Sequence, residues 1–170
     1  MSFTEREVWT LIHGMVLGAV FLLAFAGGLA DLYGLRSALV TGAGITERMR
    51  RLKVGVTAMA VAAWGTVVTG TWVVYPWYRE DVPESARSRL LADPETAEWH
   101  TFGMEWKEHI AWLSPILATV VAFTVLYYGD LLIRHQRVRR TVMVLFVLAF
   151  AFAAVAGALG ALITKAEPVT

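Results

Sequence analysis

Four long stretches without a charged residue constrain this chain more than any other feature. They lack Asp, Glu, Lys and Arg and run over Val8–Ala30, Val54–Tyr78, Ile110–Gly129 and Thr141–Thr164. An α-helix rises about 1.5 Å per residue, so about 20 apolar residues cross the roughly 30 Å hydrocarbon core of a bilayer. An outer helix of a soluble bundle would carry a polar stripe, which these stretches lack. The sequence therefore predicts an all-α integral membrane protein in which four helices form one bundle.

The rest of the chain is too short for a second globular unit. It has 170 residues and a mean hydropathy of +0.57, and most apolar residues lie in the four stretches. We expect residues 1–170 to form a single membrane domain. Its spans would lie at about 8–30, 54–78, 110–129 and 141–164, with a long loop over 79–109.

The segment before the first stretch predicts a helix start. Thr4 with Glu7, or Ser2 with Glu5, has the spacing of a capping box. The leader is acidic and the apolar run is long, so we expect a retained span and not a cleaved signal peptide.

Basic residues are divided unevenly between the connections. Nine of the 15 Lys and Arg residues lie between the first and second or the third and fourth stretches, beside three of the 14 acidic residues. Basic loops are retained on the cytoplasmic side. We therefore expect both termini and the 79–109 loop on the outer, periplasmic side of a bacterial inner (cytoplasmic) membrane. Membrane lipid is an expected partner, and no nucleic-acid partner is expected.

Two connections carry local signals of their own. Pro83 and Pro94 bracket a segment that we expect to form a short interfacial helix, with Leu90 and Leu91 entering the membrane. Residues 36–53 are rich in glycine and then basic, which predicts a surface turn followed by an amphipathic entry into the second span.

Histidines give the main functional signal. His13 lies in the first stretch and His109 opens the third, so the expected orientation brings both near the outer face. An ionisable side chain inside a span is by default a functional candidate. Gly14 and Gly18 lie beside His13 on one side of the helix, where small residues would admit a flat macrocycle or a neighbouring helix. His100 is a substitute for His109 if the outer loop folds back into the bundle.

Two neutral imidazoles from different helices are suited to hold a haem iron. A bis-histidine b-type haem serves electron transfer, because no coordination site remains open. We therefore expect one haem b with His13 and His109 as axial ligands. Its propionates would pair with basic residues near the outer face, namely Arg79, Lys107, Arg6 and Lys165.

Over its whole length the chain resembles, in plan, membrane b-type cytochromes that place bis-histidine haem in a four-helix bundle. The resemblance implies a redox subunit, and no motif assigns a particular family. A haem near the outer face would exchange electrons with quinone, a soluble redox protein or other subunits of a membrane redox complex. Glu105, Glu108, Tyr75 and Ser114 are available there for a quinol site.

Other functions remain open. The chain could be a cofactor-free accessory or structural subunit of a respiratory or photosynthetic membrane complex, with His13 hydrogen-bonded to Thr69 and its glycines used in helix packing. It could also be a membrane metal-binding protein, because Glu105 and His109 are four residues apart. No nucleophile–base pair, phosphate loop or nucleotide motif occurs. We therefore expect a subunit of an oxidoreductase complex and not an enzyme acting alone.

Overall fold

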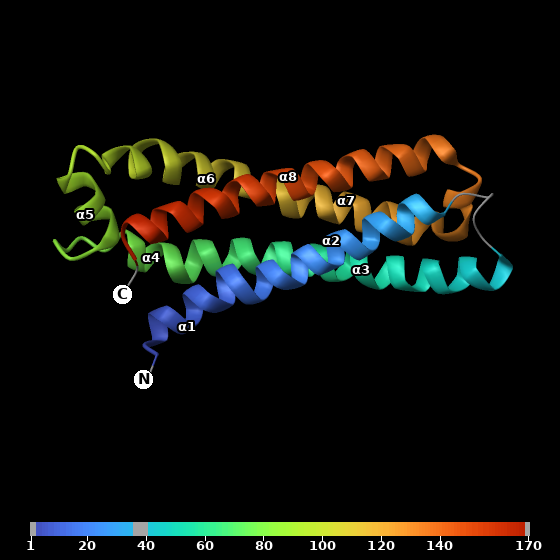
Figure 1. Ribbon diagram of the computed structural model, residues 1–170, viewed down its shortest axis with the longest axis horizontal. Coiled ribbons are helices and arrows are strands. Elements are labelled where there is room, and N and C mark those ends of the chain that lie inside the picture. Colours follow the sequence, from blue (N-terminus) through green and yellow to red (C-terminus); the bar gives the residue numbers. More distant parts are fainter. Residues whose placement is uncertain (1–2, 36–40, 169–170) are drawn as a thin grey trace.

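Four long helices lie side by side along one axis in the computed structural model, which describes residues 3–35 and 41–168 (Figure 1). They run over Glu5–Gly34, Gly42–Tyr78, Trp99–Ile133 and Gln136–Ala166. Each is long and apolar enough to cross a membrane. These helices suggest a multi-pass membrane protein, and they confirm the prediction of an all-α fold with four long apolar helices.

Local changes of pitch divide three of the long helices into segments. The first contains α1 (Glu5–Leu11), the π-helical turn η1 (Ile12–Val16) and α2 (Leu17–Gly34). The second contains α3 (Gly42–Thr69), the π-helical turn η3 (Gly70–Val74) and α4 (Tyr75–Tyr78). The third contains the π-helical turn η4 (Trp99–Met104), α6 (Glu105–Ala111), α7 (Leu113–Tyr128) and the 3-10 turn η5 (Gly129–Ile133). The fourth is α8 (Gln136–Ala166), and α5 (Ala86–Ala92) is a short helix between the second and third.

All four helices are longer than the uncharged stretches, and capping side chains fix two of their starts. Thr4 and Glu7 form the expected capping box at α1, whereas Ser2 lies outside the described residues. The Thr41 hydroxyl accepts a hydrogen bond from the Gly44 N–H at 3.2 Å and caps α3. The glycines after Thr41 therefore begin a helix, where the sequence predicted a surface turn.

Helices that are neighbours in the sequence are also neighbours in space. α2 packs on α3, α3 on α7 and α7 on α8, and α8 returns to α2. This cyclic order places the first and third long helices at opposite corners of the bundle. The main apolar core fills the middle, where Phe146 is fully buried against Gly28. A Cβ at Gly28 would lie 2.8 Å from Cζ of Phe146, so this close approach requires glycine.

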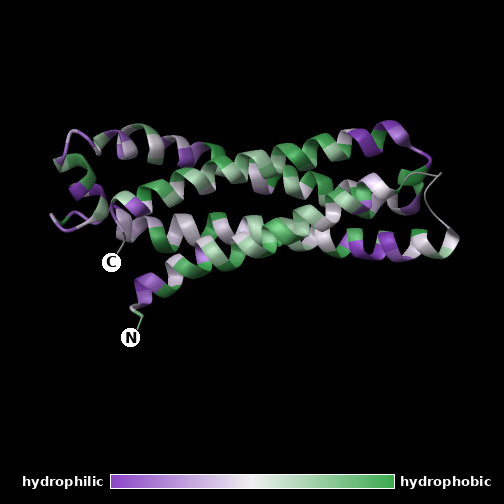
Figure 2. Cartoon of the chain, viewed as in Figure 1, coloured by the Kyte–Doolittle hydropathy of each residue, from purple (hydrophilic) through white to green (hydrophobic). Residues whose placement is uncertain are grey.

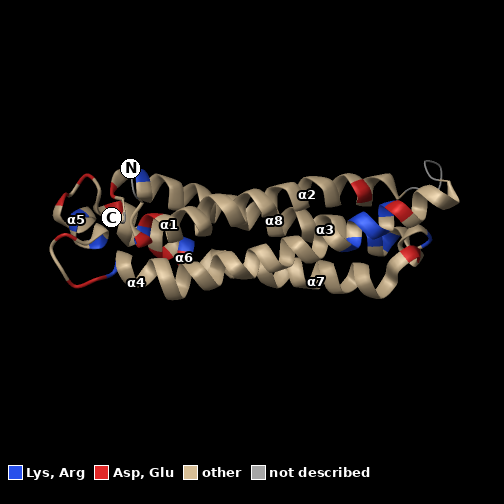
Figure 3. Ribbon diagram, turned by 90° about the horizontal axis from the view of Figure 1, so that it is seen from below, with Lys and Arg blue, Asp and Glu red and all other residues tan. Residues whose placement is uncertain are grey.

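Charged residues gather at the two ends of the bundle and leave the middle apolar (Figures 2 and 3). Both termini lie at the end that carries α5, which we call the α5 end (Figure 1). The opposite end carries the arginines of α3 and of the start of α8, and we call it the basic end.

The α5 end has a small apolar cluster of its own, made of Tyr78, Ala86, Leu90, Met104 and Ile163. The short helix predicted between the two prolines is confirmed as α5. Leu90 is fully buried in this cluster. It therefore packs on the protein, and the expectation that it enters the membrane is wrong. The third long helix begins at Trp99, which makes the preceding loop shorter than the predicted 79–109.

At the basic end, Arg139 of α8 joins the ends of two other helices. Its guanidinium donates to the Leu35 carbonyl oxygen at 2.6 Å, and to those of Leu132 and Ile133 at 3.3 Å each. Leu35 is the C-cap residue of α2, and the other two are the last residues of the third long helix. The last carbonyls of a helix have no partner within it, so a buried arginine satisfies groups that would otherwise be unpaired.

We predict that Arg139→Met lowers the free energy of unfolding by about 3 kcal/mol, because buried carbonyls on two helices lose a charged donor. The measurement is helical circular dichroism during denaturant titration in detergent micelles. Arg140→Met is the matched control, because Arg140 is exposed one position along α8. Equal stability of the two variants would contradict the prediction.

Candidate functional site

A layer of polar side chains interrupts the apolar packing in the half of the bundle nearer α5. It lies between the main core and the small cluster at the α5 end. We call it the polar layer, and it consists of His13, Thr69, Tyr75, Lys107 and Glu108. All five are partly buried. Ionisable groups at such a depth are costly unless they are paired or used, so this layer is the candidate site.

Two π-helical turns face each other at the polar layer. His13 lies in η1, and Gly70 begins η3. η1 packs on α3, and α1 packs on η3. π-helical turns inside α-helices occur frequently at functional sites, because the extra residue redirects a side chain.

The hydrogen bond of His13 fixes which ring nitrogen carries the proton. Nδ1 lies 3.2 Å from the Thr69 hydroxyl oxygen. The Thr69 hydroxyl donates its own hydrogen to the Gly65 carbonyl at 2.7 Å, so it accepts from the His13 Nδ1–H. The hydrogen bond between His13 and Thr69, which the sequence analysis gave as an alternative role for His13, is therefore present. With Nδ1 as the donor, Nε2 of His13 carries the lone pair, and the Thr66 carbonyl is a second hydrogen-bond partner of the ring.

Gly70 makes the position of the His13 ring possible. A Cβ at Gly70 would lie 2.7 Å from Cε1 of His13, which is closer than atoms of this kind approach. The imidazole therefore packs directly on the backbone of the second long helix.

Lys107 reaches the same layer from the opposite corner of the bundle. Its side chain lies against Gly160 of α8, where a Cβ would be 2.9 Å from Cε of Lys107. The ammonium group interacts electrostatically with His13 and with Glu108. The layer thus places an amine and an imidazole within electrostatic range of each other in an otherwise apolar interior.

A chain of polar contacts leads from the layer to the surface at the α5 end. The Tyr75 hydroxyl donates to Oε2 of Glu108 at 2.9 Å. Arg79 donates to the Tyr75 hydroxyl oxygen and pairs with Glu105 at 3.6 Å. Oε1 of Glu108 and the hydroxyl of Ser114 are buried without a hydrogen-bond partner among the described residues. The carboxylate oxygen can accept a hydrogen bond from a ligand, and the hydroxyl can donate or accept one, without displacing a protein group.

The structure does not bring His13 and His109 together. His109 is exposed on α6, and its Nδ1–H donates to the Glu105 carbonyl at 2.6 Å, which leaves its Nε2 free. Lys107 is the residue of α6 that interacts with His13. Two residues along a helix correspond to a turn of about 200°, so Lys107 and His109 point in nearly opposite directions.

His100 is buried and uses both ring nitrogens. Its Nδ1 lies 2.8 Å from the Tyr78 hydroxyl, and its Nε2 accepts from Nε–H of Arg87 at 3.4 Å. The expected substitute ligand therefore has no free nitrogen in this structure. The role of Tyr78 as its partner was not visible in the sequence, because the two residues belong to different helices.

The glycines beside His13 have open space at their Cβ positions among the described residues. A Cβ built on Gly14 or Gly18 would meet no atom within 4 Å, so this side of the first long helix is uncovered. Sequence reasoning named both glycines but could not tell which way they face.

Within residues 3–35 and 41–168, no three His, Cys, Asp or Glu side chains gather closely enough to hold a metal ion. No family model, curated protein sequence or solved structure matches the chain. What is established is thus a four-helix all-α protein with four long apolar helices, and function is inferred from the polar layer.

We predict that Gly70→Ala lowers the free energy of unfolding by about 1–3 kcal/mol, because the new methyl group overlaps the His13 ring. In a His13→Ala background the same change costs less than about 1 kcal/mol. Denaturant titration of the two single variants and the double variant measures this coupling.

Gly157→Ala is the control for the added methyl group, because nothing lies within 4 Å of that position. If Gly70→Ala costs the same with and without His13, the two residues are not in contact.

Proposed function

We propose that this protein is a membrane-embedded electron-transfer subunit that holds one b-type haem in the polar layer, with His13 as the first axial ligand. The observation that carries the proposal is the lone pair on Nε2 of His13, whose Nδ1–H is held by Thr69. A ligating histidine needs a lone pair on one ring nitrogen and a hydrogen-bond acceptor for the other. His13 meets both requirements within an apolar bundle.

His109 is the proposed second ligand, and because it points away from His13 in this structure, ligation of the same iron requires α6 to turn about its axis. The Nδ1–H of His109 is also held by an oxygen, which leaves Nε2 free, whereas both nitrogens of His100 are engaged. These hydrogen bonds favour His109 over His100. His109 lies on the exposed side of α6, so ligation by His109 is tested separately from ligation by His13, with its own variant.

When bound, the haem would supply one-electron transfer. The residues of the chain would position the haem, pair with its propionates and accept protons. Thr69 holds the His13 ring in one tautomer, and Lys107 and Arg79 offer positive charge to the propionates. Tyr75 and Glu108 form a hydroxyl–carboxylate pair that can accept a proton from a quinol in the bilayer.

We further propose that the α5 end faces the periplasm and that the membrane is a bacterial inner membrane. The basic residues at the opposite end support this orientation, because positive loops remain in the cytoplasm (Figure 3). A quinone in the bilayer and a soluble redox protein at the α5 end are the proposed exchange partners.

A cofactor-free accessory subunit is the second candidate, and the uncovered side of the first long helix favours it. Gly14 and Gly18 form a Gly-x-x-x-Gly pair, and in the part of the chain that the structure describes nothing lies within 4 Å of their Cβ positions. Such pairs allow two membrane helices to approach closely. On either proposal the protein works beside other subunits of a respiratory or photosynthetic membrane complex.

The reduced-minus-oxidised absorption spectrum of the purified protein, with pyridine haemochrome quantitation, tests haem binding. We expect one haem b per chain in the wild type and none in His13→Ala, because the iron loses its first ligand. His109→Ala should shift the low-spin bands or lose the haem.

His100→Ala and His135→Ala are the controls and should keep the haem spectrum, because both nitrogens of His100 are engaged and His135 is exposed at the basic end, directly before α8. A folded preparation with neither haem nor metal would overturn the redox proposal and leave the accessory subunit as the better one.

Orientation is tested with single cysteines, because the natural chain has none. We predict that Glu95→Cys, near α5, reacts with a membrane-impermeant maleimide added to intact spheroplasts. Ala43→Cys, at the basic end, should react only after the membrane is opened. The reverse pattern would contradict the proposed orientation.

A further inference from the structure

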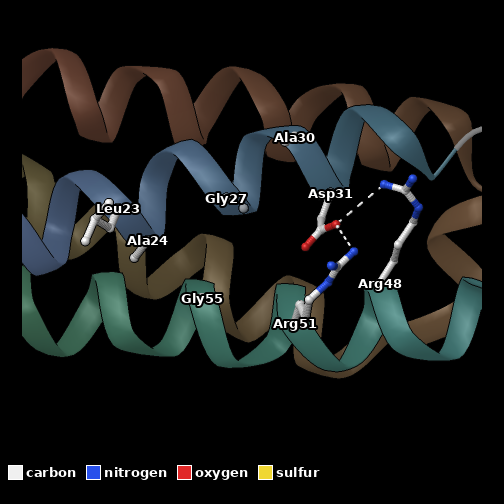
Figure 4. Close-up of a pocket in the computed structure, with 9 residues that line it drawn as sticks. Leu23, Ala24, Gly27, Ala30, Asp31, Arg48, Arg51 and Gly55 are labelled. Atoms are coloured by element: carbon white, nitrogen blue, oxygen red, sulfur yellow. Dashed lines mark hydrogen bonds and ion pairs between the residues drawn. The ribbon is translucent and has the colours of Figure 1, made fainter.

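We propose that the groove between α2 and α3 at the basic end binds an acidic phospholipid. The phosphate group would lie on Arg48 and Arg51, and one acyl chain would lie along the small residues next to them. Figure 4 shows the groove, with the two arginines converging on Asp31 at one end. This proposal does not depend on the haem or on the direction of insertion.

The groove combines an apolar wall with a charged end. Its volume is about 390 Å³. The wall is formed by Leu23, Ala24, Gly27, Gly28, Ala30 and Gly55, and the end by Asp31, Arg48 and Arg51. The side chain of Leu23 is exposed on the outside of the bundle, so the groove opens to the side, where the lipid of a membrane would be.

Asp31 does not neutralise the two arginines that meet it. Its Oδ1 lies 3.2 Å from Nη2 of Arg51 and 3.6 Å from Nη1 of Arg48. One carboxylate against two guanidinium groups leaves a local charge of about +1. Because a guanidinium presents several N–H donors in one plane, each arginine can hold the carboxylate and still donate to a phosphate oxygen.

The space beside these residues is created by glycines. Gly27 has no atom within 4 Å of a Cβ position, and a Cβ on Gly55 would approach only the Ala24 carbonyl oxygen, at 3.6 Å. Gly34 lies directly under the guanidinium of Arg48, so a larger residue there would displace that side chain. These glycines therefore leave space for an acyl chain and room for the Arg48 side chain that would bind the headgroup.

Charge and position together select the occupant. A soluble anion would use the arginines but leave the apolar wall uncovered, and a neutral lipid would leave the positive charge unpaired. An acidic phospholipid satisfies both parts, because its phosphate lies at the level of the headgroups while its chains enter the hydrocarbon core. Basic pockets between membrane helices bind acidic headgroups for this reason.

Native mass spectrometry of the purified protein in detergent micelles tests the proposal. Dioleoyl phosphatidylglycerol and dioleoyl phosphatidylcholine, which share their acyl chains, are added separately. We expect phosphatidylglycerol to bind about tenfold or more tightly than phosphatidylcholine, and the double variant Arg48→Gln/Arg51→Gln to lose this preference. Inorganic phosphate at millimolar concentration should not displace the bound lipid.

Arg50→Gln is the matched control, because Arg50 lies between the two arginines in sequence but pairs with Glu47 on an exposed face. It should keep the preference. Gly27→Leu fills the slot and should weaken binding of both lipids. Circular dichroism of each variant verifies that the helices are intact. Equal binding of the two lipids by the wild type, or the same loss in Arg50→Gln as in the double variant, would overturn the proposal.

Discussion

The hydrocarbon core of a bilayer contains no water, and the rest of this structure depends on that constraint. Every backbone N–H and C=O group at that depth must be paired within the protein, which continuous helices achieve. The four long helices therefore run through the apolar middle, and their irregularities are π-helical and 3-10 turns and the single turn residue Trp112 between α6 and α7. Charged side chains are displaced to the ends, where headgroups and water can solvate them (Figure 3).

The two ends of the bundle are held together by different interactions. At the basic end, one buried guanidinium on α8 serves the last carbonyls of two other helices, so a single side chain holds three helices together. At the α5 end, a short helix covers the bundle and contributes Leu90 to a second apolar cluster. The polar layer lies between this cluster and the main core, away from both the Arg139 hydrogen bonds and the cluster under α5.

The polar layer is the one part of the interior that apolar packing does not explain. Its members come from three of the four long helices, and their contacts leave Oε1 of Glu108 without a hydrogen-bond partner among the described residues and Nε2 of His13 with a lone pair. Unused polar atoms in a bundle of this kind are costly if they serve no ligand. That cost is why we assign function to this layer.

The sequence by itself determined what depends on position along the chain. The four apolar lengths, the capping box at Thr4 and the helix between two prolines are local properties, and the pattern of residues predicts each of them. Tertiary structure alone decided which side of each helix faces inward. Because the four stretches are apolar all round, no polar stripe marks their buried face, and rotation about the helix axis cannot be read from them. For this reason the sequence paired His13 with His109, whereas packing turned Lys107 towards His13 and left His109 on the surface.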